Sequence, residues 1–132
     1  MISRNLARAR LAMRIWSRYL LVRLHLARRQ PLDDTIDALR RRTPASPINQ
    51  EPRQLGRSVV RALRVGRLQP RCLTLALIHM SLLNDNGTPG QLVIGLPDQA
   101  CSPRAHAWIE IDGVDIGPPP GRHGHQELVR YF

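Results

Sequence analysis

The chain has 132 residues, two cysteines and a formal net charge of +10, and all of its cationic residues are arginine. This length suits one domain with a modest core, two cysteines make no disulfide framework, and arginines interrupt the apolar N-terminal stretch too often for a membrane span. The charge is uneven, because residues 1–71 carry 17 arginines against 4 acidic residues (+13) and residues 72–132 carry 3 against 6 (−3). The first half is therefore basic, and the second half is near neutral.

Residues 2–29 are predicted to form a long amphipathic helix that Pro31 ends. Its apolar residues are spaced by threes and fours, so they share one face, which we expect to meet the core or a partner. This apolar face comprises Ile2, Leu6, Ala9, Met13, Trp16, Leu20, Leu24 and Ala27. The rest of the circumference carries Arg4, Arg8, Arg10, Arg14, Arg18 and Arg29.

Two shorter helices are predicted in the rest of the basic half. Residues 32–42 have acidic side chains in the first turn and arginines in the last, the polarity that the helix dipole favours. Residues 43–52 contain three prolines and are predicted to be a loop. A helix over residues 54–65 follows, with Gly66 as its C-terminal stop.

The second half changes from a helical to a strand pattern. An apolar helix is predicted from Cys72 to about Asn84, and residues 91–96 are predicted to be a strand. Residues 104–111 and 114–117 form a hairpin around Asp112 and Gly113, a strong two-residue turn signal, and we expect a short tail after it. Helices followed by an antiparallel sheet predict an α+β fold in which the Cys72 helix packs on a small sheet.

Cys72 and His106 are the pair of residues that most specifically indicates a chemical function, namely nucleophilic catalysis. A thiol at a helix N-terminus, next to Arg71, is biased toward the thiolate. An imidazole brought alongside can take the proton and return it. The pattern is also compatible with non-catalytic roles, in which Cys72 is a small buried residue and His106 is a structural histidine in a strand.

Other candidate groups are weaker. His79 lies two turns after Cys72 on the same helix, roughly 10 Å away by helical rise, so we interpret it as structural. Cys101 is interpreted as a loop residue. His123 and His125 lack the spacing of a zinc site, so we expect no metal and no cofactor.

These residues resemble the leader peptidases of lasso-peptide biosynthesis, which belong to the bacterial transglutaminase-like (papain-like) cysteine protease superfamily. The resemblance covers roughly residues 61–117. It is carried by Cys72 with its flanking Arg71 and Leu73, by the leucine-rich helix that follows and by Gly95. It is carried above all by the segment Ala-His-Ala-Trp-Ile-Glu-Ile-Asp-Gly that contains His106.

The resemblance implies a cysteine endopeptidase that removes the leader from a ribosomally made precursor before a separate ATP-dependent cyclase closes the macrolactam. Its implied partners are the lasso precursor peptide, a separate leader-recognition protein and the macrolactam cyclase. It implies a transglutaminase-like core over residues 54–132, preceded by a basic helical region with a proline-rich linker over residues 1–53. Because no secretory signal is recognisable, we expect a cytoplasmic protein with free thiols.

The chain departs from the family pattern at the third catalytic residue. The family's triad acid lies twelve residues after the histidine, and here that position is Pro118. With the turn at Asp112 and Gly113, Asp115 pairs with Glu110 and lies roughly 13 Å along the strand from His106. Asp115 is therefore only a weak third-member candidate. A backbone carbonyl, another residue or no third member at all remain open, as does a catalytically degenerate homologue.

A competing interpretation assigns the function to the basic half. Net positive charge and an arginine-covered helix are typical of proteins that bind nucleic acids or anionic membranes. The chain has few aromatic residues for base stacking and no recognisable recognition motif. We therefore expect no nucleic-acid partner and favour the peptidase.

Overall fold

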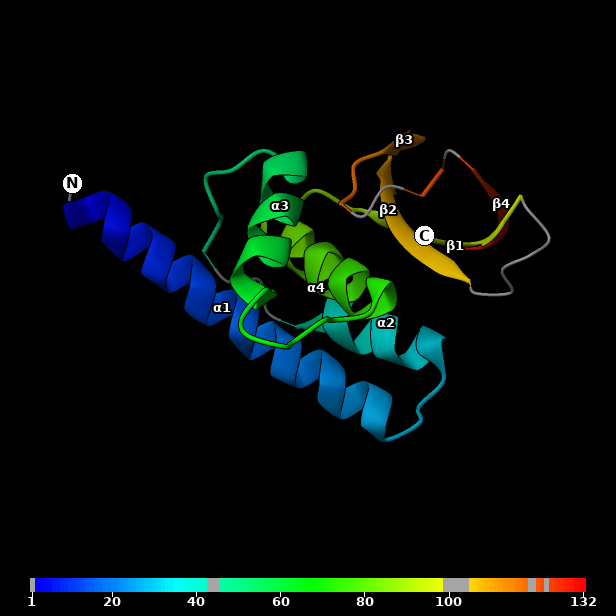
Figure 1. Ribbon diagram of the computed structural model, residues 1–132, viewed down its shortest axis with the longest axis horizontal. Coiled ribbons are helices and arrows are strands. Elements are labelled where there is room, and N and C mark those ends of the chain that lie inside the picture. Colours follow the sequence, from blue (N-terminus) through cyan, green and yellow to red (C-terminus); the bar gives the residue numbers. More distant parts are fainter. Residues whose placement is uncertain (1, 43–45, 99–104, 119–120, 123) are drawn as a thin grey trace.

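The computed structural model of the chain describes residues 2–42, 46–98, 105–118, 121–122 and 124–132. It confirms the predicted α+β fold, with helices packed on a small antiparallel sheet (Figure 1). The described elements are α1 (Ile2–Ala27), α2 (Leu32–Arg41), α3 (Pro52–Leu63), α4 (Cys72–Asp85), β1 (Gln91–Pro97), β2 (His106–Ile111), β3 (Val114–Asp115) and β4 (His125–Tyr131). Within these residues, no helix is long and apolar enough to cross a membrane.

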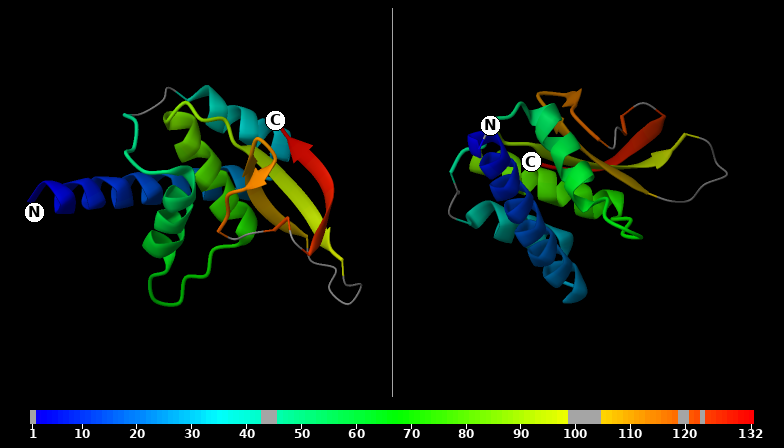
Figure 2. Two further views of the ribbon diagram at one scale, coloured as in Figure 1. Left: turned by 90° about the horizontal axis from the view of Figure 1, so that it is seen from above. Right: turned by 60° about the vertical axis from the view of Figure 1, so that its left-hand side comes forward.

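Helix α4 is the centre of the molecule. It contacts the three other helices and strands β1 and β2, so it lies between the helical layer and the sheet (Figures 1 and 2). Its residues are apolar around the whole circumference, and ten of its side chains are buried. A helix that is apolar on all sides must be buried on all sides, which is why this segment became the core helix.

The hairpin that carries His106 has the predicted register. Asp112 and Gly113 both adopt positive φ angles, 50° and 78°, as the tight two-residue turn requires. Glu110 consequently faces Asp115, and Ile111 faces Val114. The sheet order is β3-β2-β1-β4 with antiparallel neighbours throughout.

Most of the apolar face predicted for α1 lies outside the core, so its packing on the core is not confirmed and its contact with a partner stays a prediction. Leu6, Met13, Leu20 and Leu24 are exposed, Met13 by 73% and Leu20 by 65%. The face that packs on α3 and α4 is turned away from that stripe and is formed by Leu11, Ile15, Arg18, Val22 and Leu26. The first turns of α1 project beyond the rest of the molecule, and residues 3–10 are all exposed (Figure 1).

The buried position of Arg18 explains how α1 is oriented. Arg18 is 4% exposed, and its guanidinium donates through Nη2 to Asp85 Oδ2 at 2.8 Å and through Nη1 to the Ser81 hydroxyl. Arg14 lies 3.7 Å from the same Asp85 oxygen. Burial lowers the pKa of Arg18, and the charge of Asp85 opposes that shift. The buried Asp85 carboxylate of α4 therefore determines that α1 packs with Arg18 facing α4, because a buried charge without a partner is very costly.

Residues on both sides of the boundary expected at residue 53 share one hydrophobic core. Ile15, Val22 and Leu39 from the first region belong to the same buried cluster as Leu77 and Ile109. The division into two regions stays a prediction, and the basic helices pack directly on the nucleophile helix.

The end of the chain forms a strand, where the sequence led us to expect a short tail. Strand β4 pairs with β1 at the edge of the sheet, and the register shifts between Ile94 and Gly95. Ile94 faces Val129 and Gly95 faces Glu127, so Leu128 is the extra residue of a β-bulge. A Cβ at Gly95 would lie 2.6 Å from the carbonyl oxygen of Gln126, so the close approach of the two strands requires glycine there.

Candidate active site

Cys72 is the first residue of α4, as predicted. Arg71 occupies the N-cap with no side-chain hydrogen bond to the helix, and the first backbone bond of this turn runs from the Leu75 N–H to the Arg71 carbonyl. The N–H groups of the first turn therefore have no partners within the helix, and they lie at its electropositive end. Cys72 itself is half-buried.

His106 is the first residue of β2, and its imidazole forms a hydrogen bond with the Cys72 thiol. This bond lowers the pKa of Cys72 below the usual value for a thiol, and partial burial opposes the shift. Backbone hydrogen bonds from Ala107 and Leu73 and the charge of His106 lower it further. The arrangement thus favours a thiolate paired with an imidazolium.

The ring of His106 lies in a stack of aromatic side chains. The His125 ring, at the start of β4, is nearly parallel to it with centroids 4.8 Å apart, and the Trp108 ring lies at 6.0 Å. His125 Nδ1 donates to the Gly121 carbonyl at 2.8 Å. A Cβ at Gly121 would lie 2.2 Å from the Trp108 ring and 2.8 Å from His106, so glycine is required for this contact. His125 and Gly121 therefore fix the plane of the His106 ring.

The role of His125 is not predicted from the sequence. The segment from His125 to Glu127 is polar and has little strand propensity, so the sequence indicates a tail there. Residues 125–131 show no regular alternation, and they form a strand through pairing with β1.

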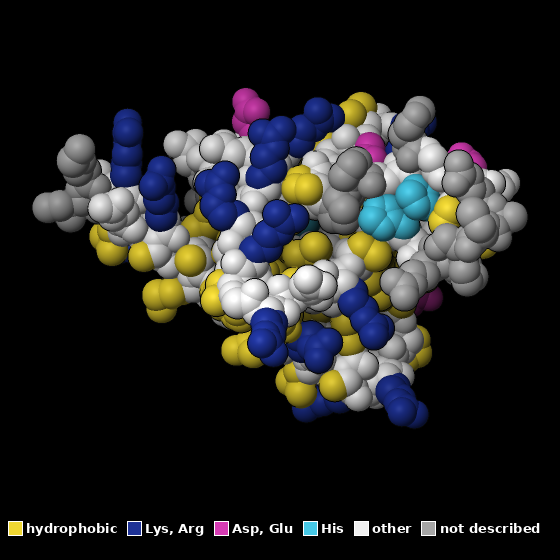
Figure 3. Space-filling view, viewed as in Figure 1, with side chains coloured by type: hydrophobic (Ala, Val, Ile, Leu, Met, Phe, Trp, Pro, Cys, Tyr) yellow, Lys and Arg dark blue, Asp and Glu magenta, His cyan; other side chains and the backbone are white. Residues whose placement is uncertain are grey.

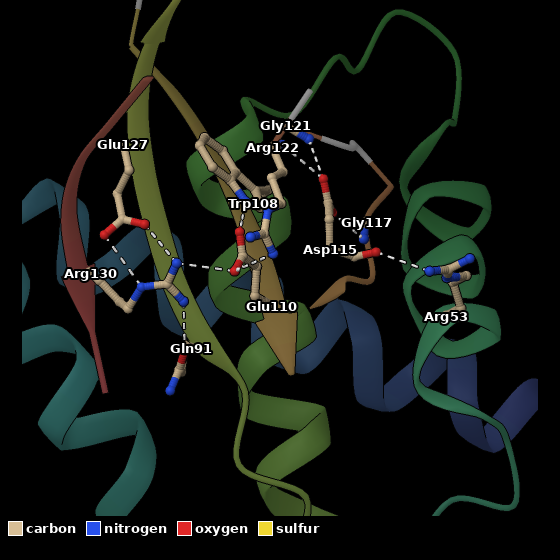
Figure 4. A network of polar contacts seen from close by, with 10 residues as sticks. All are labelled: Arg53, Gln91, Trp108, Glu110, Asp115, Gly117, Gly121, Arg122, Glu127 and Arg130. Atoms are coloured by element: carbon tan, nitrogen blue, oxygen red, sulfur yellow. Dashed lines mark hydrogen bonds and ion pairs between the residues drawn. The ribbon is translucent and has the colours of Figure 1, made fainter. Parts of the chain in front are cut away.

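Asp115 lies where the hairpin register places it, and its carboxylate binds backbone groups (Figure 4). Oδ1 accepts from the Gly117 N–H at 2.9 Å, and Oδ2 accepts from the N–H groups of Gly121 at 2.7 Å and Arg122 at 2.9 Å. Arg53 of α3 donates to the Asp115 carbonyl at 3.1 Å. Asp115 thus holds the segment that packs on His106 through Gly121. An aspartate two residues before a glycine, an Asx-turn signal, already indicates the first of these bonds.

A second polar network includes Trp108 and joins strands β1, β2 and β4 (Figure 4). The Trp108 indole N–H donates to Glu110 Oε2 at 2.7 Å, and Glu110 is 1% exposed. Arg130 of β4 donates to Glu110 Oε1 at 3.0 Å and to Gln91 at 2.6 Å. A hydrogen bond to Glu127 raises the pKa of Arg130. The buried carboxylate is thereby paired, and Trp108 is fixed beside His106.

The remaining sequence candidates lie elsewhere. His79 is buried against α3, and its Nε2 donates to the Pro52 carbonyl at 2.7 Å, a structural position. Cys101, the other thiol, and His123 lie outside the described residues. Pro118 lies beside Gly56 of α3. Across the described part of the chain, no group of three or more His, Cys, Asp or Glu side chains is arranged to hold a metal ion.

Cys72 at the start of a core helix is hydrogen-bonded to His106 at the start of an antiparallel strand. This arrangement defines a class of α+β folds in which a thiol on a helix lies next to an imidazole on a strand. A profile described as the transglutaminase-like superfamily matches residues 16–130, and the chain belongs to this superfamily. Its members are commonly cysteine peptidases or transglutaminases. Comparisons with curated proteins and with solved structures find no match.

Proposed function

We propose that this protein is a cysteine endopeptidase that removes the leader from a lasso-peptide precursor before a separate ATP-dependent cyclase closes the macrolactam. Cys72 is its nucleophile and His106 its general acid and base. The observation that carries the proposal is the hydrogen bond between these two side chains at the N-terminus of α4. The resemblance of the segments around Cys72 and His106 to lasso leader peptidases supports the substrate class.

In the first step, the Cys72 thiolate attacks the carbonyl carbon of the scissile peptide bond. N–H groups of the first turn of α4, which have no carbonyl partners within the helix, stabilise the negative charge that develops on the carbonyl oxygen. The His106 imidazolium gives its proton to the leaving amine as the C–N bond breaks. A thioester on Cys72 and a free amine result.

In the second step, neutral His106 takes a proton from water, and the resulting hydroxide attacks the thioester. The C–S bond breaks, the leader leaves as a carboxylic acid, and Cys72 returns to the thiolate paired with imidazolium. Asp115 takes no part in these proton transfers. It is a positioning residue, since it holds Gly121, and Gly121 with His125 fixes the imidazole plane.

The test uses the purified chain, a separate leader-recognition protein and the cognate lasso precursor peptide. Mass spectrometry of the mixture is expected to show the leader and the core peptide as separate products. Cys72→Ala and His106→Ala each abolish cleavage, and the double variant is no worse than either, because the pair acts as a unit. Cys101→Ala is the matched control and keeps activity. Cleavage by the Cys72→Ala protein would contradict the proposal.

A catalytically degenerate homologue is the second candidate, and the position of Pro118 is the specific observation that favours it. Such a protein would bind the precursor without cutting it. Pro118→Asp separates the two candidates, because a carboxylate at this position would help to orient the imidazole of a working site. If the wild-type protein cleaves the precursor and the variant keeps or raises that cleavage activity, the result supports the peptidase. Wild-type and variant proteins that both bind the precursor and both leave it intact support the degenerate homologue.

A further inference from the structure

The outer face of α3 carries a row of arginines with no counter-charge. Arg57, Arg61 and Arg64 are spaced by four and three residues, so they lie on one side of the helix, and all three are exposed. Among the described residues, none of their three guanidinium groups has an ion pair or a side-chain hydrogen bond. Residues 52–71 contain six arginines and no acidic residue. Like charges one turn apart destabilise a helix, so this row is explained best by an anionic partner.

Three surface depressions meet along this row. The first, of about 470 Å³, lies between α1 and α3, where Arg8, Arg57 and Arg61 surround an apolar floor that includes Ile15. The second, of about 410 Å³, shares Arg57 and Arg61 with it and is lined also by Arg64. The third, of about 420 Å³, shares Arg64 and ends at Gln69, Pro70 and Leu75. The shared side chains make one track over α3.

The third depression reaches the start of α4. Pro70 is two residues before Cys72, and Leu75 is one helical turn after it. Figure 3 shows arginine side chains, hydrophobic side chains and histidine side chains on one face of the molecule. The arginine track, defined by Arg8, Arg57, Arg61 and Arg64, therefore runs from the α1–α3 groove to the segment that leads into α4.

The chemistry of the track favours a peptide over a nucleic acid. Its walls combine arginines with the amide and hydroxyl groups of Gln54 and Ser58, and its floor is aliphatic. Bases bind by stacking on exposed aromatic rings. The two aromatic residues of the basic half, Trp16 and Tyr19, instead pack on the core and on each other, with centroids 5.5 Å apart.

We infer that the arginine track binds a peptide segment rich in both acidic and aliphatic residues and leads it to Cys72. Guanidinium groups bind the carboxylates, and the apolar floor takes the aliphatic side chains. The identity of this segment as part of the substrate rests on the proposed peptidase function, whereas its binding to the track does not.

The binding test uses the full chain with Cys72→Ala, which keeps peptides intact, and fluorescence anisotropy. The probes are a labelled peptide of alternating glutamate and leucine, the same peptide with glutamine for glutamate, and a single-stranded DNA of similar length. The acidic peptide is expected to bind best, with an affinity that falls as salt is added. Charge reversal at Arg57, Arg61 and Arg64 raises its Kd at least about tenfold.

Arg28→Glu with Arg41→Glu is the matched control, since both are exposed arginines outside the track, and it leaves Kd nearly unchanged. If the reversal variant melts early, the Arg→Gln triple variant replaces it, because glutamine keeps helix propensity. Equal binding of the glutamine peptide, tighter binding of DNA, or equal loss in the control variant would each overturn the inference.

The link to the nucleophile has its own test. Saturating acidic peptide is expected to slow alkylation of Cys72 in the wild-type chain several-fold, and the glutamine peptide is not. Binding without protection would overturn the assigned direction of the track. Because no cleavage is measured, failure here is distinct from failure of the peptidase assignment, which depends on products that require Cys72.

Discussion

Helices α1 and α4 show two different ways in which a sequence specifies burial. Helix α4 is apolar on every side and is buried on every side, so its position follows from composition. Helix α1 is longer and has two apolar stripes, of which the fold buries the one containing Ile15 and leaves the one containing Leu20 exposed. Hydrophobic spacing therefore identifies a helix that packs, but a polar contact, Arg18 with Asp85, decides which face does so.

The largest effect is expected at that contact. Asp85→Ala leaves the Arg18 guanidinium buried without its carboxylate, and we expect the free energy of unfolding to fall by about 3–5 kcal/mol. Urea denaturation followed by circular dichroism measures the loss. The double variant Arg18→Met with Asp85→Leu is the control, because it removes both charges and is expected to recover most of the stability. A double variant as unstable as the single one would show that the pair does not decide the orientation of α1.

Helices α4 and α1 give a matched pair of Leu→Ala substitutions. Leu77→Ala on α4 leaves a cavity in the core, which costs about 2–5 kcal/mol of unfolding free energy. Leu20→Ala on α1 removes an exposed side chain and changes stability by no more than about 0.5 kcal/mol. The same denaturation experiment compares them. A large loss at Leu20 would mean that the exposed stripe of α1 is covered in solution.

His79 tests how α4 tolerates a polar side chain. Burial lowers its pKa, because the imidazolium is disfavoured there. The unfolded chain takes up a proton near the ordinary value, about 6.5, before the folded chain does. Stability is therefore complete above that pH and falls as the pH decreases below it. Melting temperatures between neutral and mildly acidic pH measure this loss, and His79→Gln, whose amide still donates to Pro52, is expected to reduce it. An equal pH dependence in both proteins would assign it to other groups.

The smallest effect is kinetic and concerns the start of α4. The bond to His106 lowers the pKa of Cys72, so alkylation of Cys72 reaches its half-maximal rate at a pH below the usual thiol value. His106→Gln removes the imidazole and is expected to move that midpoint upward. The pH profile of iodoacetamide labelling, read by peptide mass spectrometry, gives both values. Coincident profiles in the two proteins would show that His106 does not activate the thiol.

Much of the fold could be predicted from local signals. The start of α4 at Cys72 and the hairpin register around Asp112 and Gly113 depend on a few neighbouring residues, and both predictions are confirmed. The orientation of α1 depends on Asp85, which lies more than sixty residues along the chain from Arg18. Strand β4 depends on pairing with β1, which overrides its weak strand propensity. Contacts between distant segments are the part that sequence patterns do not contain.

The residues of the candidate site likewise divide into those that local sequence signals predict and those that depend on contacts between distant segments. Cys72 and His106 could be predicted because each sits at the end of a recognisable element, and the structure brings them together. The stacking of His125 on His106 could not, since it needs the unpredicted strand. For Asp115, the register predicted its separation from His106 along the strand, but not its bonds to the backbone of Gly121 and Arg122.

The bulge at Leu128 affects the tendency of copies of this chain to aggregate at high concentration. A regular strand at a sheet edge is a template for another strand, and uncontrolled pairing of such edges produces aggregates. Leu128, 60% exposed, interrupts the pairing pattern of β4, while Glu127 and Arg130 place charges along it. Deleting Leu128 would restore regular alternation next to Gly95 and remove that interruption. The extra residue thus protects solubility at the edge of the sheet, one strand away from His106, which pairs with Gly95.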